Sequence, residues 1–348
     1  MRPNRWGKRF CHNRDGIGES SLATYQPKEA NRRSCTALCT VDALFLNRRL
    51  ATMQTSAFTR SDTLFGMLLT IFLFVKSDIK TTLIPITIFS VSSAPLCTPH
   101  RIVPVVWWIF LHLLQFDTSN QIQDVEEDAK NKPIRPLPAG LISLRHAIIL
   151  RWGLVPACWI ISILHGGPVL FSSVALVLFT ILYNELQAHR HWLTKNVVTA
   201  IGFASFEIGG TLIAGCDASH MDAAACLSVA ISTAVFATTI HTQDFKDEEG
   251  DRLTGRMTLP IVSPQLGRAS VLPLLAFWSI AVSFVWELTW AYSILLLCFS
   301  VLIGVRFLLL RSRAADQTSF LLYNVWLSAV HMLPGYWRYL QYQDPFLK

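Results

Sequence analysis

Long apolar segments constrain the fold of this chain more than any other feature of its sequence. Windows of about nineteen residues detect segments that are long enough to cross a bilayer as helices. Nine such segments lie at about 81–97, 101–119, 144–163, 166–186, 195–215, 221–243, 265–287, 289–311 and 318–337. Several are joined by very short turns, so consecutive helices should pack antiparallel. The sequence therefore predicts an all-α fold, a polytopic membrane bundle of about nine transmembrane helices.

The composition agrees with a membrane environment but does not identify an activity. Of the 348 residues, 52% are hydrophobic and 15% are charged, and the mean hydropathy is +0.40. These values are too apolar for a typical soluble protein, but receptors and transporters share them. A further apolar stretch, Leu64 to Val75, is too short to span a bilayer, and we interpret it as an interfacial or re-entrant helix.

The amino-terminal segment differs from the rest of the chain. Residues 1–52 contain ten Lys and Arg against four Asp and Glu, which accounts for +6 of the formal net charge of +7. We expect residues 1–60 to form a disordered basic arm, because they cannot bury enough apolar surface to fold alone. A patch that contacts anionic lipid headgroups is the alternative. The eight cysteines are scattered without CxxC pairs, so no zinc site is expected.

Basic residues are concentrated in alternate connections between the apolar segments. The connections after the second, fourth, sixth and eighth segments hold Lys130, Lys132, Arg135, Arg190, Lys195, Lys246, Arg252, Arg256, Arg311 and Arg313. The positive-inside bias therefore places the amino terminus and these connections in the cytosol, and the carboxyl terminus on the opposite side. We expect a multi-pass protein of the endoplasmic reticulum, with the lipid bilayer as its surroundings and no nucleic-acid partner.

The first acidic motif follows the second apolar segment. Asn120, Asp124 and Asp128 are spaced i, i+4 and i+8, so on one continuous helix they would share a face. Like charges at that spacing are destabilising without a cation, which indicates a metal ion. The second motif, Asp244, Asp247 and Asp251, repeats the design after the sixth segment.

Together the two motifs predict a site for Mg²⁺ and a phosphate group. Mg²⁺ usually takes one or two carboxylates and completes its coordination with waters and phosphate oxygens. Basic residues that suit phosphate contact accompany both motifs, namely Lys130, Lys132, Arg135, Lys246, Arg252 and Arg256. A transporter or another binding protein would not need matched acidic motifs with phosphate counter-charges, so we favour an enzyme.

These motifs resemble those of the UbiA superfamily of intramembrane prenyltransferases. That family has N-D-x-x-D-x-x-x-D and R-P-L-P-x-G after its second helix, and D-x-x-D-x-x-G-D after its sixth. Here the segments 120–128 and 135–140 match the first pair, and 244–251 matches the last. The resemblance implies a catalytic domain over 61–348, with an isoprenyl diphosphate at the cytosolic end of a central cavity. It assigns the metal role to Asn120, Asp124, Asp128, Asp244, Asp247 and Asp251, with Mg²⁺ as cofactor.

Two departures from the family pattern bear on the reaction. Gln121 replaces the usual aspartate beside Asn120, and the stretch from Asp128 to Arg135 is short. Both features are similar to the fungal branch of membrane-bound terpene cyclases, which includes the sesquiterpene cyclase of fumagillin biosynthesis. The resemblance implies that farnesyl diphosphate is ionised with Mg²⁺ and cyclised to a sesquiterpene. The alternative is transfer of the prenyl group to an aromatic acceptor.

Several residues inside the apolar segments are candidates for the cyclisation cavity. A cyclase must exclude water and present aromatic faces to a migrating cation. Phe116, Phe236 and Tyr183 fit this role, although phenylalanine on a membrane helix is usually ordinary packing. Glu207 lies deep in the fifth segment, where an acid indicates either a pocket role or a structural hydrogen bond. Asp117 and His241 could support the motif residues as hydrogen-bonding partners.

Overall fold

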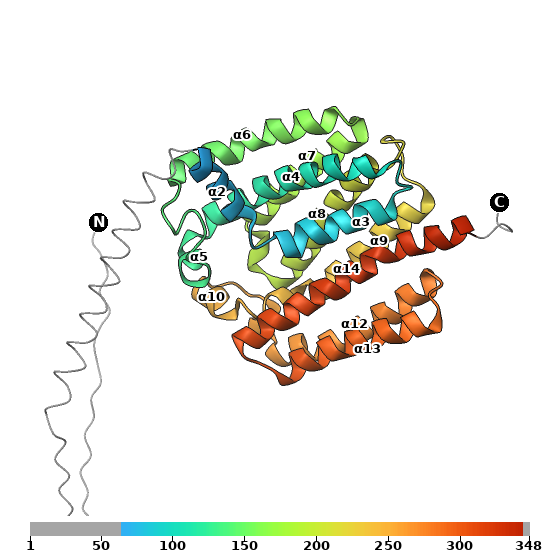
Figure 1. Cartoon of the computed structure of the whole chain (residues 1–348). Helices are drawn as coiled ribbons and strands as arrows, with labels where there is room; N and C mark the ends of the chain where they lie inside the picture. The colour runs from blue at the N-terminus through green and yellow to red at the C-terminus, as the bar shows by residue number, and fades with distance from the viewer. Residues whose placement is uncertain (1–63, 344–348) are drawn as a thin grey trace, which may run out of the picture. The chain divides into compact units, whose positions relative to one another are not determined.

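A computed structural model describes residues 64–343 of the chain, and every regular element in this part is a helix or a helical turn. The expected basic arm, 1–60, lies outside the described residues. The helices are α2 (Leu64–Val75), α3 (Ile84–Ser93), α4 (Ile102–Gln123), α5 (Val125–Asn131), α6 (Leu144–Ile163), α7 (Gly167–Thr180), α8 (Trp192–Ala214), α9 (Ala223–Thr239), α10 (Glu248–Leu253), α11 (Leu259–Val262), α12 (Pro264–Val285), α13 (Trp290–Leu309) and α14 (Arg313–Gln343). Figure 1 shows the long helices side by side in a bundle, with α5 and α10 at one end.

The all-α membrane bundle is confirmed, and each expected apolar segment coincides with a helix. Within the described residues, seven helices are long and apolar enough to cross a membrane. The first expected segment, 81–97, is shorter than predicted, because α3 follows the π-helical turn Ile79–Leu83 and ends at Ser93. The last, 318–337, lies within the 31-residue helix α14, which carries more polar residues. The helix expected over Leu64 to Val75 is present as α2.

Local sequence signals account for where the helices begin. The Ser143 and Asp222 side chains cap α6 and α9 by accepting hydrogen bonds from the amides of His146 and Ala225, at 3.3 and 2.9 Å. Before α7, Gly166 adopts a φ of +130°, which only glycine tolerates readily. The two caps and Gly166 allow the chain to turn within a few residues, so that neighbouring helices run antiparallel.

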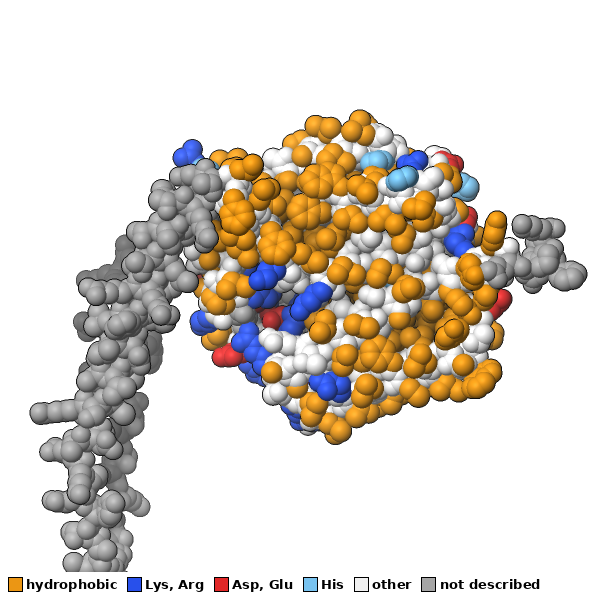
Figure 2. Space-filling view, viewed as in Figure 1, with side chains coloured by type: hydrophobic (Ala, Val, Ile, Leu, Met, Phe, Trp, Pro, Cys, Tyr) orange, Lys and Arg blue, Asp and Glu red, His pale blue; other side chains and the backbone are white. Residues whose placement is uncertain are grey.

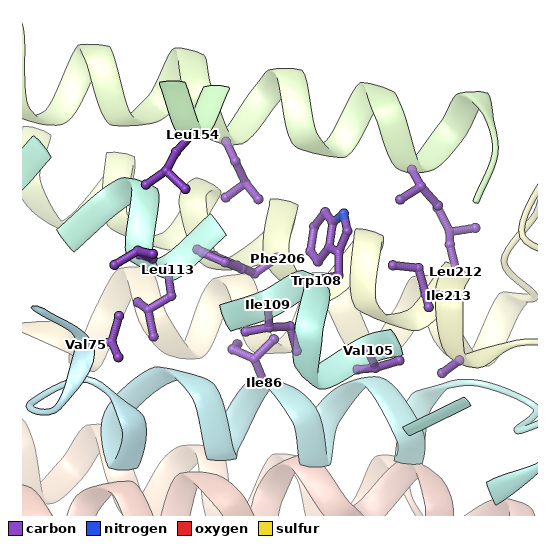
Figure 3. Packing of buried hydrophobic residues seen from close by; sticks show 14 of the residues in the cluster. Val75, Ile86, Val105, Trp108, Ile109, Leu113, Leu154, Phe206, Leu212 and Ile213 are labelled. Carbon is purple, nitrogen blue, oxygen red and sulfur yellow. The ribbon is translucent and has the colours of Figure 1, made fainter. Parts of the chain in front are cut away.

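One half of the core is centred on Trp108 of α4. Figure 3 shows Trp108 among Ile86, Ile109 and Phe206, which come from α3, α4 and α8. Its indole Nε1 donates a hydrogen bond to Ser162 Oγ at 2.8 Å, so the ring is fixed as well as buried. Gly209 of α8 lies directly against this ring, and a Cβ atom there would collide with it. The close approach of α4 and α8 therefore depends on this glycine.

The bundle has two ends that differ in chemistry. At one, which we call the charged end, the segment that follows the second acidic motif is joined to the connection between α7 and α8 by backbone hydrogen bonds from Met257 N to Arg190 O at 2.7 Å and from Trp192 N to Met257 O at 2.9 Å. At the opposite end, Leu96 and Gly215 form an isolated antiparallel bridge between the α3–α4 and α8–α9 connections. Both acidic motifs lie at the charged end.

Candidate active site

The first motif is not carried by one continuous helix, contrary to the expectation. Helix α4 ends at Gln123, Asp124 has φ −114° and ψ 27°, and α5 begins at Val125. The i to i−4 hydrogen bonds persist through the break, at 3.2 Å from Asp124 N to Asn120 O and 2.8 Å from Asp128 N to Asp124 O. The break therefore separates α4 from α5, while Asn120, Asp124 and Asp128 remain linked by hydrogen bonds four residues apart.

The second motif likewise spans short helical pieces. Asp244 follows the 3-10 turn Ile240–Gln243, Asp247 precedes α10, and Asp251 lies within α10. The expected helix over 221–243 therefore ends in a tighter turn just before the motif. Helices α5 and α10 pack against each other, which brings the two motifs together.

A cavity of about 750 Å³ opens between the motifs and extends among the helices. Figure 2 shows Lys and Arg side chains around a hollow on this face, with acidic atoms inside it. Every residue assigned to the metal role lines the cavity: Asn120, Asp124, Asp128, Asp244, Asp247 and Asp251. The predicted phosphate contacts Lys132, Arg135, Lys246 and Arg256 line it too. The structure thus brings both motifs and these four basic residues to one cavity.

Each motif aspartate is paired with a basic side chain. The closest contacts are Asp124–Arg256 at 2.6 Å, Asp128–Arg135 at 2.7 Å, Asp244–Lys195 at 2.5 Å, Asp247–Lys246 at 2.8 Å and Asp251–Arg256 at 3.2 Å. Arg256 therefore bridges the two motifs, and it also lies 3.0 Å from Glu127. Eight acidic and eight basic side chains line the cavity, so their formal charges cancel.

This charge balance and two buried oxygens fit a metal ion that arrives with an anion. Asp244 Oδ2 and Asp251 Oδ2 are buried, line the cavity and accept no hydrogen bond. Among the described residues, no three His, Cys, Asp or Glu side chains are already grouped as a metal cage. A hard cation that takes only one or two carboxylates, and phosphate oxygens for the rest, suits such a site. Since the cavity is formally neutral, a diphosphate would bring unbalanced negative charge unless a cation accompanied it.

The raised pKa values of two cavity carboxyl groups also indicate that the site can accommodate a further cation. Burial raises the pKa of Asp244 to about 6, although the Lys195 ammonium opposes the shift. Burial also raises the pKa of Glu127 to about 7, against the opposing charge of Arg256. At both positions, desolvation of the carboxylate outweighs its basic partner. A further cation at the site would stabilise both ionised forms.

The inner part of the cavity is aromatic. Phe116, Tyr183, Phe203 and Phe236 all line it. The Phe203 and Phe236 rings are stacked with centroids 4.0 Å apart, and those of Phe116 and Tyr183 lie 5.6 Å apart. Tyr183 belongs to a π-helical turn, Ile181–Glu185, of the kind often found at functional sites. The cavity therefore combines a charged opening with an aromatic interior.

Three predicted catalytic or diphosphate-binding residues do not line the cavity. Lys130 is exposed on α5, and Arg252 is exposed and pairs with Glu248 of its own helix at 2.7 Å. Glu207 is fully buried among α8, α9 and α14, where it accepts a hydrogen bond from Ser232 at 2.5 Å and lies 3.7 Å from His331. Of the two roles considered for Glu207, the structure favours the structural hydrogen bond.

The structure also shows where Asp117, His241 and Gln121 lie relative to the cavity. Asp117 is buried and lines the cavity, but His241 Nε2 lies 3.2 Å from Gly267 O, so the expectation that it supports the motif is wrong. Gln121 donates to Phe74 O at 2.9 Å and does not line the cavity. The replacement at position 121 therefore joins α4 to α2 and removes a possible metal ligand.

Sequence reasoning missed some residues of the cavity. Lys195, treated only as a connection charge, is buried in the first turn of α8 and contacts Asp244. A single lysine at the start of an apolar helix is the signal that could have identified it. Asp78 and Lys80, near the π-helical turn before α3, also line the cavity, and Asp78 lies 3.8 Å from Arg135. Nothing local in the sequence connects this turn to the motifs.

Comparison with known proteins agrees with this geometry. Residues 82–328 match the UbiA prenyltransferase family. The chain is 32% identical to the fumagillin beta-trans-bergamotene synthase af520 of Aspergillus fumigatus over 77% of this chain and 92% of that protein. It is 28% identical to the polyprenyl transferase eriF of Hericium erinaceus over 59% of this chain and 72% of that one. A UbiA homolog from Archaeoglobus fulgidus bound to DMAPP and Mg²⁺ has a similar fold, with a TM-score of 0.60 at 15% identity, covering 77% of this chain and 98% of its own.

The fold and the cavity define an integral, multi-pass membrane enzyme with a charged opening to an apolar interior. The family match spans most of the described bundle and includes both acidic motifs. The chain belongs to the UbiA prenyltransferase family. It is similar both to a terpene cyclase and to prenyltransferases of that family.

Proposed function

We propose that the chain is a membrane-bound terpene cyclase that ionises farnesyl diphosphate with Mg²⁺ and closes it to a sesquiterpene. The observation that carries this proposal is a cavity in which paired acidic and basic side chains at the opening are continuous with stacked aromatic rings inside. Its catalytic domain comprises 61–348, and its active site faces the cytosol from the membrane of the endoplasmic reticulum. The 32% identity to a bergamotene synthase over 77% of this chain supports cyclisation.

The ion pairs suggest how the protein binds the diphosphate. Asp124 and Asp244 would hold Mg²⁺, together with the other motif residues that line the cavity. Their present partners, Arg256 and Lys195, would then be able to contact phosphate oxygens. When bound, Mg²⁺ supplies Lewis-acid polarisation of the leaving diphosphate. The basic side chains stabilise the negative charge that develops as the C–O bond of the substrate breaks.

The aromatic interior supports capture of the cation within the same molecule. Loss of diphosphate leaves an allylic carbocation, which the distal double bonds of the chain can attack. The faces of Phe116, Phe203 and Phe236 attract positive charge and offer no nucleophile. Exclusion of water by this apolar wall prevents premature quenching to an alcohol.

The second candidate is transfer of the prenyl group to an aromatic acceptor. It is favoured by the similarity to the polyprenyl transferase eriF, and the charged opening of the cavity would serve both reactions. The two candidates differ after ionisation, because a transferase needs an external nucleophile. Membranes containing the protein, incubated with farnesyl diphosphate and Mg²⁺ with or without a phenolic acceptor, separate them. A cyclase forms a volatile cyclic hydrocarbon without the acceptor, whereas prenylated phenol formed only with the acceptor would establish the transferase.

A further inference from the structure

Two cysteines meet at the opposite end of the bundle, away from the active site. Cys97 lies in the connection between α3 and α4, and Cys216 lies in the connection between α8 and α9. The backbones of these connections are held together by the Leu96–Gly215 antiparallel bridge. Cys97 N also donates to Ala214 O at 3.4 Å. Residues far apart in the sequence are thus fixed beside each other.

The bridge places both cysteine side chains on one face. In an antiparallel pair, directly opposite residues share a face, and successive residues along a strand alternate between faces. With Leu96 opposite Gly215, Cys97 and Cys216 occupy diagonal positions across the bridge, where extended backbone would direct both side chains to the same side. Hydrogen bonding with the Cys97 thiol raises the pKa of the Cys216 thiol, which agrees with this proximity. Both side chains are exposed and therefore accessible to an oxidant.

Under the proposed orientation, the connections that carry Cys97 and Cys216 lie in an oxidising compartment. If the charged end faces the cytosol, the two connections face the lumen, an environment in which disulfides persist. No Lys or Arg lies in the α8–α9 connection, in agreement with that side of the membrane. The other cysteines of the described part of the chain do not lie in these connections: Cys158 is buried in α6, and Cys226 and Cys298 lie within helices α9 and α13.

We propose that Cys97 and Cys216 form a disulfide that ties the start of α4 to the end of α8. The bond forms by thiol–disulfide exchange: the thiolate of one cysteine attacks a disulfide donor, and the second cysteine displaces the donor's remaining thiolate. The two protein thiols are oxidised, and the donor, oxidised glutathione or an oxidoreductase disulfide, is reduced to two thiols. Helix α4 carries Asn120 at its far end and α8 carries Lys195 at its start, so the bond fixes the two helices that flank the cavity.

Mass spectrometry of the full chain in microsomes tests this inference. Free thiols are blocked with N-ethylmaleimide at lysis, and the protein is digested without reduction. The expected result is a peptide pair joined through Cys97 and Cys216, with Cys226 recovered as the blocked thiol. The variants C97S and C216S should each leave the remaining cysteine blocked and lower the melting temperature, and the double variant should lower it no further, because both remove the same bond. C226S serves as the matched control and should retain the linked peptides.

Recovery of both cysteines as maleimide adducts would overturn the proposal. Oxidised glutathione added to the reduced, purified protein then distinguishes the reasons. A cross-link that forms there but not in microsomes would mean that these connections face the reducing cytosol, so the orientation would be at fault. Failure to cross-link in both settings would mean that the two thiols do not meet. Neither result depends on whether the enzyme is a cyclase or a transferase.

Discussion

Arg256 and Lys195 are the basic residues that pair with aspartates of the acidic motifs and that we propose contact phosphate. Arg256 contacts Asp124 and Asp251, one from each motif, and Lys195 contacts Asp244 from within α8. Removing a carboxylate from such a pair leaves a buried cation without its partner and removes a proposed ligand for the metal. The motif residues should therefore act as one unit, with little activity left when any of the central ones is changed.

Asp124→Asn and Asp244→Asn should each lower turnover by about 100-fold or more, because each removes a proposed metal ligand and the carboxylate that positions a basic side chain. Turnover is measured at saturating Mg²⁺, and membrane insertion is checked by extraction and thermal unfolding. Glu248→Gln is the control, since Glu248 is ion-paired on α10 but does not line the cavity. Near-normal turnover in a correctly inserted Asp124 or Asp244 variant would refute the metal assignment.

Phe116→Leu and Phe236→Leu should change the ratio of cyclic products more than the rate of diphosphate release. The reason is that these rings lie in the aromatic interior, whereas the proposed ionisation takes place at the charged end. Products are quantified by gas chromatography, and diphosphate by a coupled assay. Phe277→Leu, on the exposed face of α12, should leave both unchanged. An unaltered product profile in both cavity variants would remove these rings from the cyclisation.

At the scale of helices, α12 and α14 are joined by a buried bidentate pair near the charged end. Arg268 donates to both carboxylate oxygens of Asp316 at 2.9 Å and to Phe307 O at 3.0 Å. The pair does not line the cavity, so its role is to fix α14 against the α12–α13 hairpin. Helix α14 contributes part of the cavity wall, including Asn324.

Arg268→Met should destabilise the protein by about 3–5 kcal/mol, because it leaves the Asp316 carboxylate buried and unpaired. The exposed pair Arg252–Glu248 provides the comparison, and Arg252→Met should cost at most about 1 kcal/mol. Thermal unfolding in detergent measures both. Adding Asp316→Leu to Arg268→Met should recover part of the loss. Equal effects of the buried and exposed variants would contradict the structural role of the buried pair.

The helices could be predicted from the sequence because length and hydropathy determine them directly. The segments 144–163 and 265–287 agree with α6 and α12 to within two residues at each end. The break at Asp124 could not be predicted, because it lies within a pattern that a straight helix would also satisfy. The extension of α14 to Gln343 was missed for a different reason, since its polar face lowers the mean hydropathy of the segment.

At the scale of the whole molecule, the candidate site was predictable where it repeats a family motif and unpredictable where it depends on tertiary contacts. The six motif residues and four of the basic residues line the cavity as expected. Lys130 and Arg252 share the same sequence signal but face outward, because helix periodicity places neighbouring residues on different faces. The contribution of Asp78 depends on how the π-helical turn before α3 packs beside Arg135, which no local pattern encodes.

The orientation of the bundle is a separate prediction at this scale. A reporter fused after Lys348 should lie in the lumen, and one fused before Met1 should lie in the cytosol, because the basic connections alternate along the chain. Glycosylation of an added acceptor site measures lumenal exposure, and protease protection measures the cytosolic side. Detection of both termini on the same side would mean an even number of spans and an error in the assignment of α3 or α14.

The central claim is that the cation formed at the charged end is captured within its own chain. Its most direct measurement is the stoichiometry of products from purified protein given only farnesyl diphosphate and Mg²⁺. We predict one cyclic sesquiterpene released for each diphosphate, with no requirement for an acceptor and with release by the Asp244→Asn variant slowed by about 100-fold or more. Linear farnesol as the sole product, or a product formed only when a phenolic acceptor is added, would contradict the account.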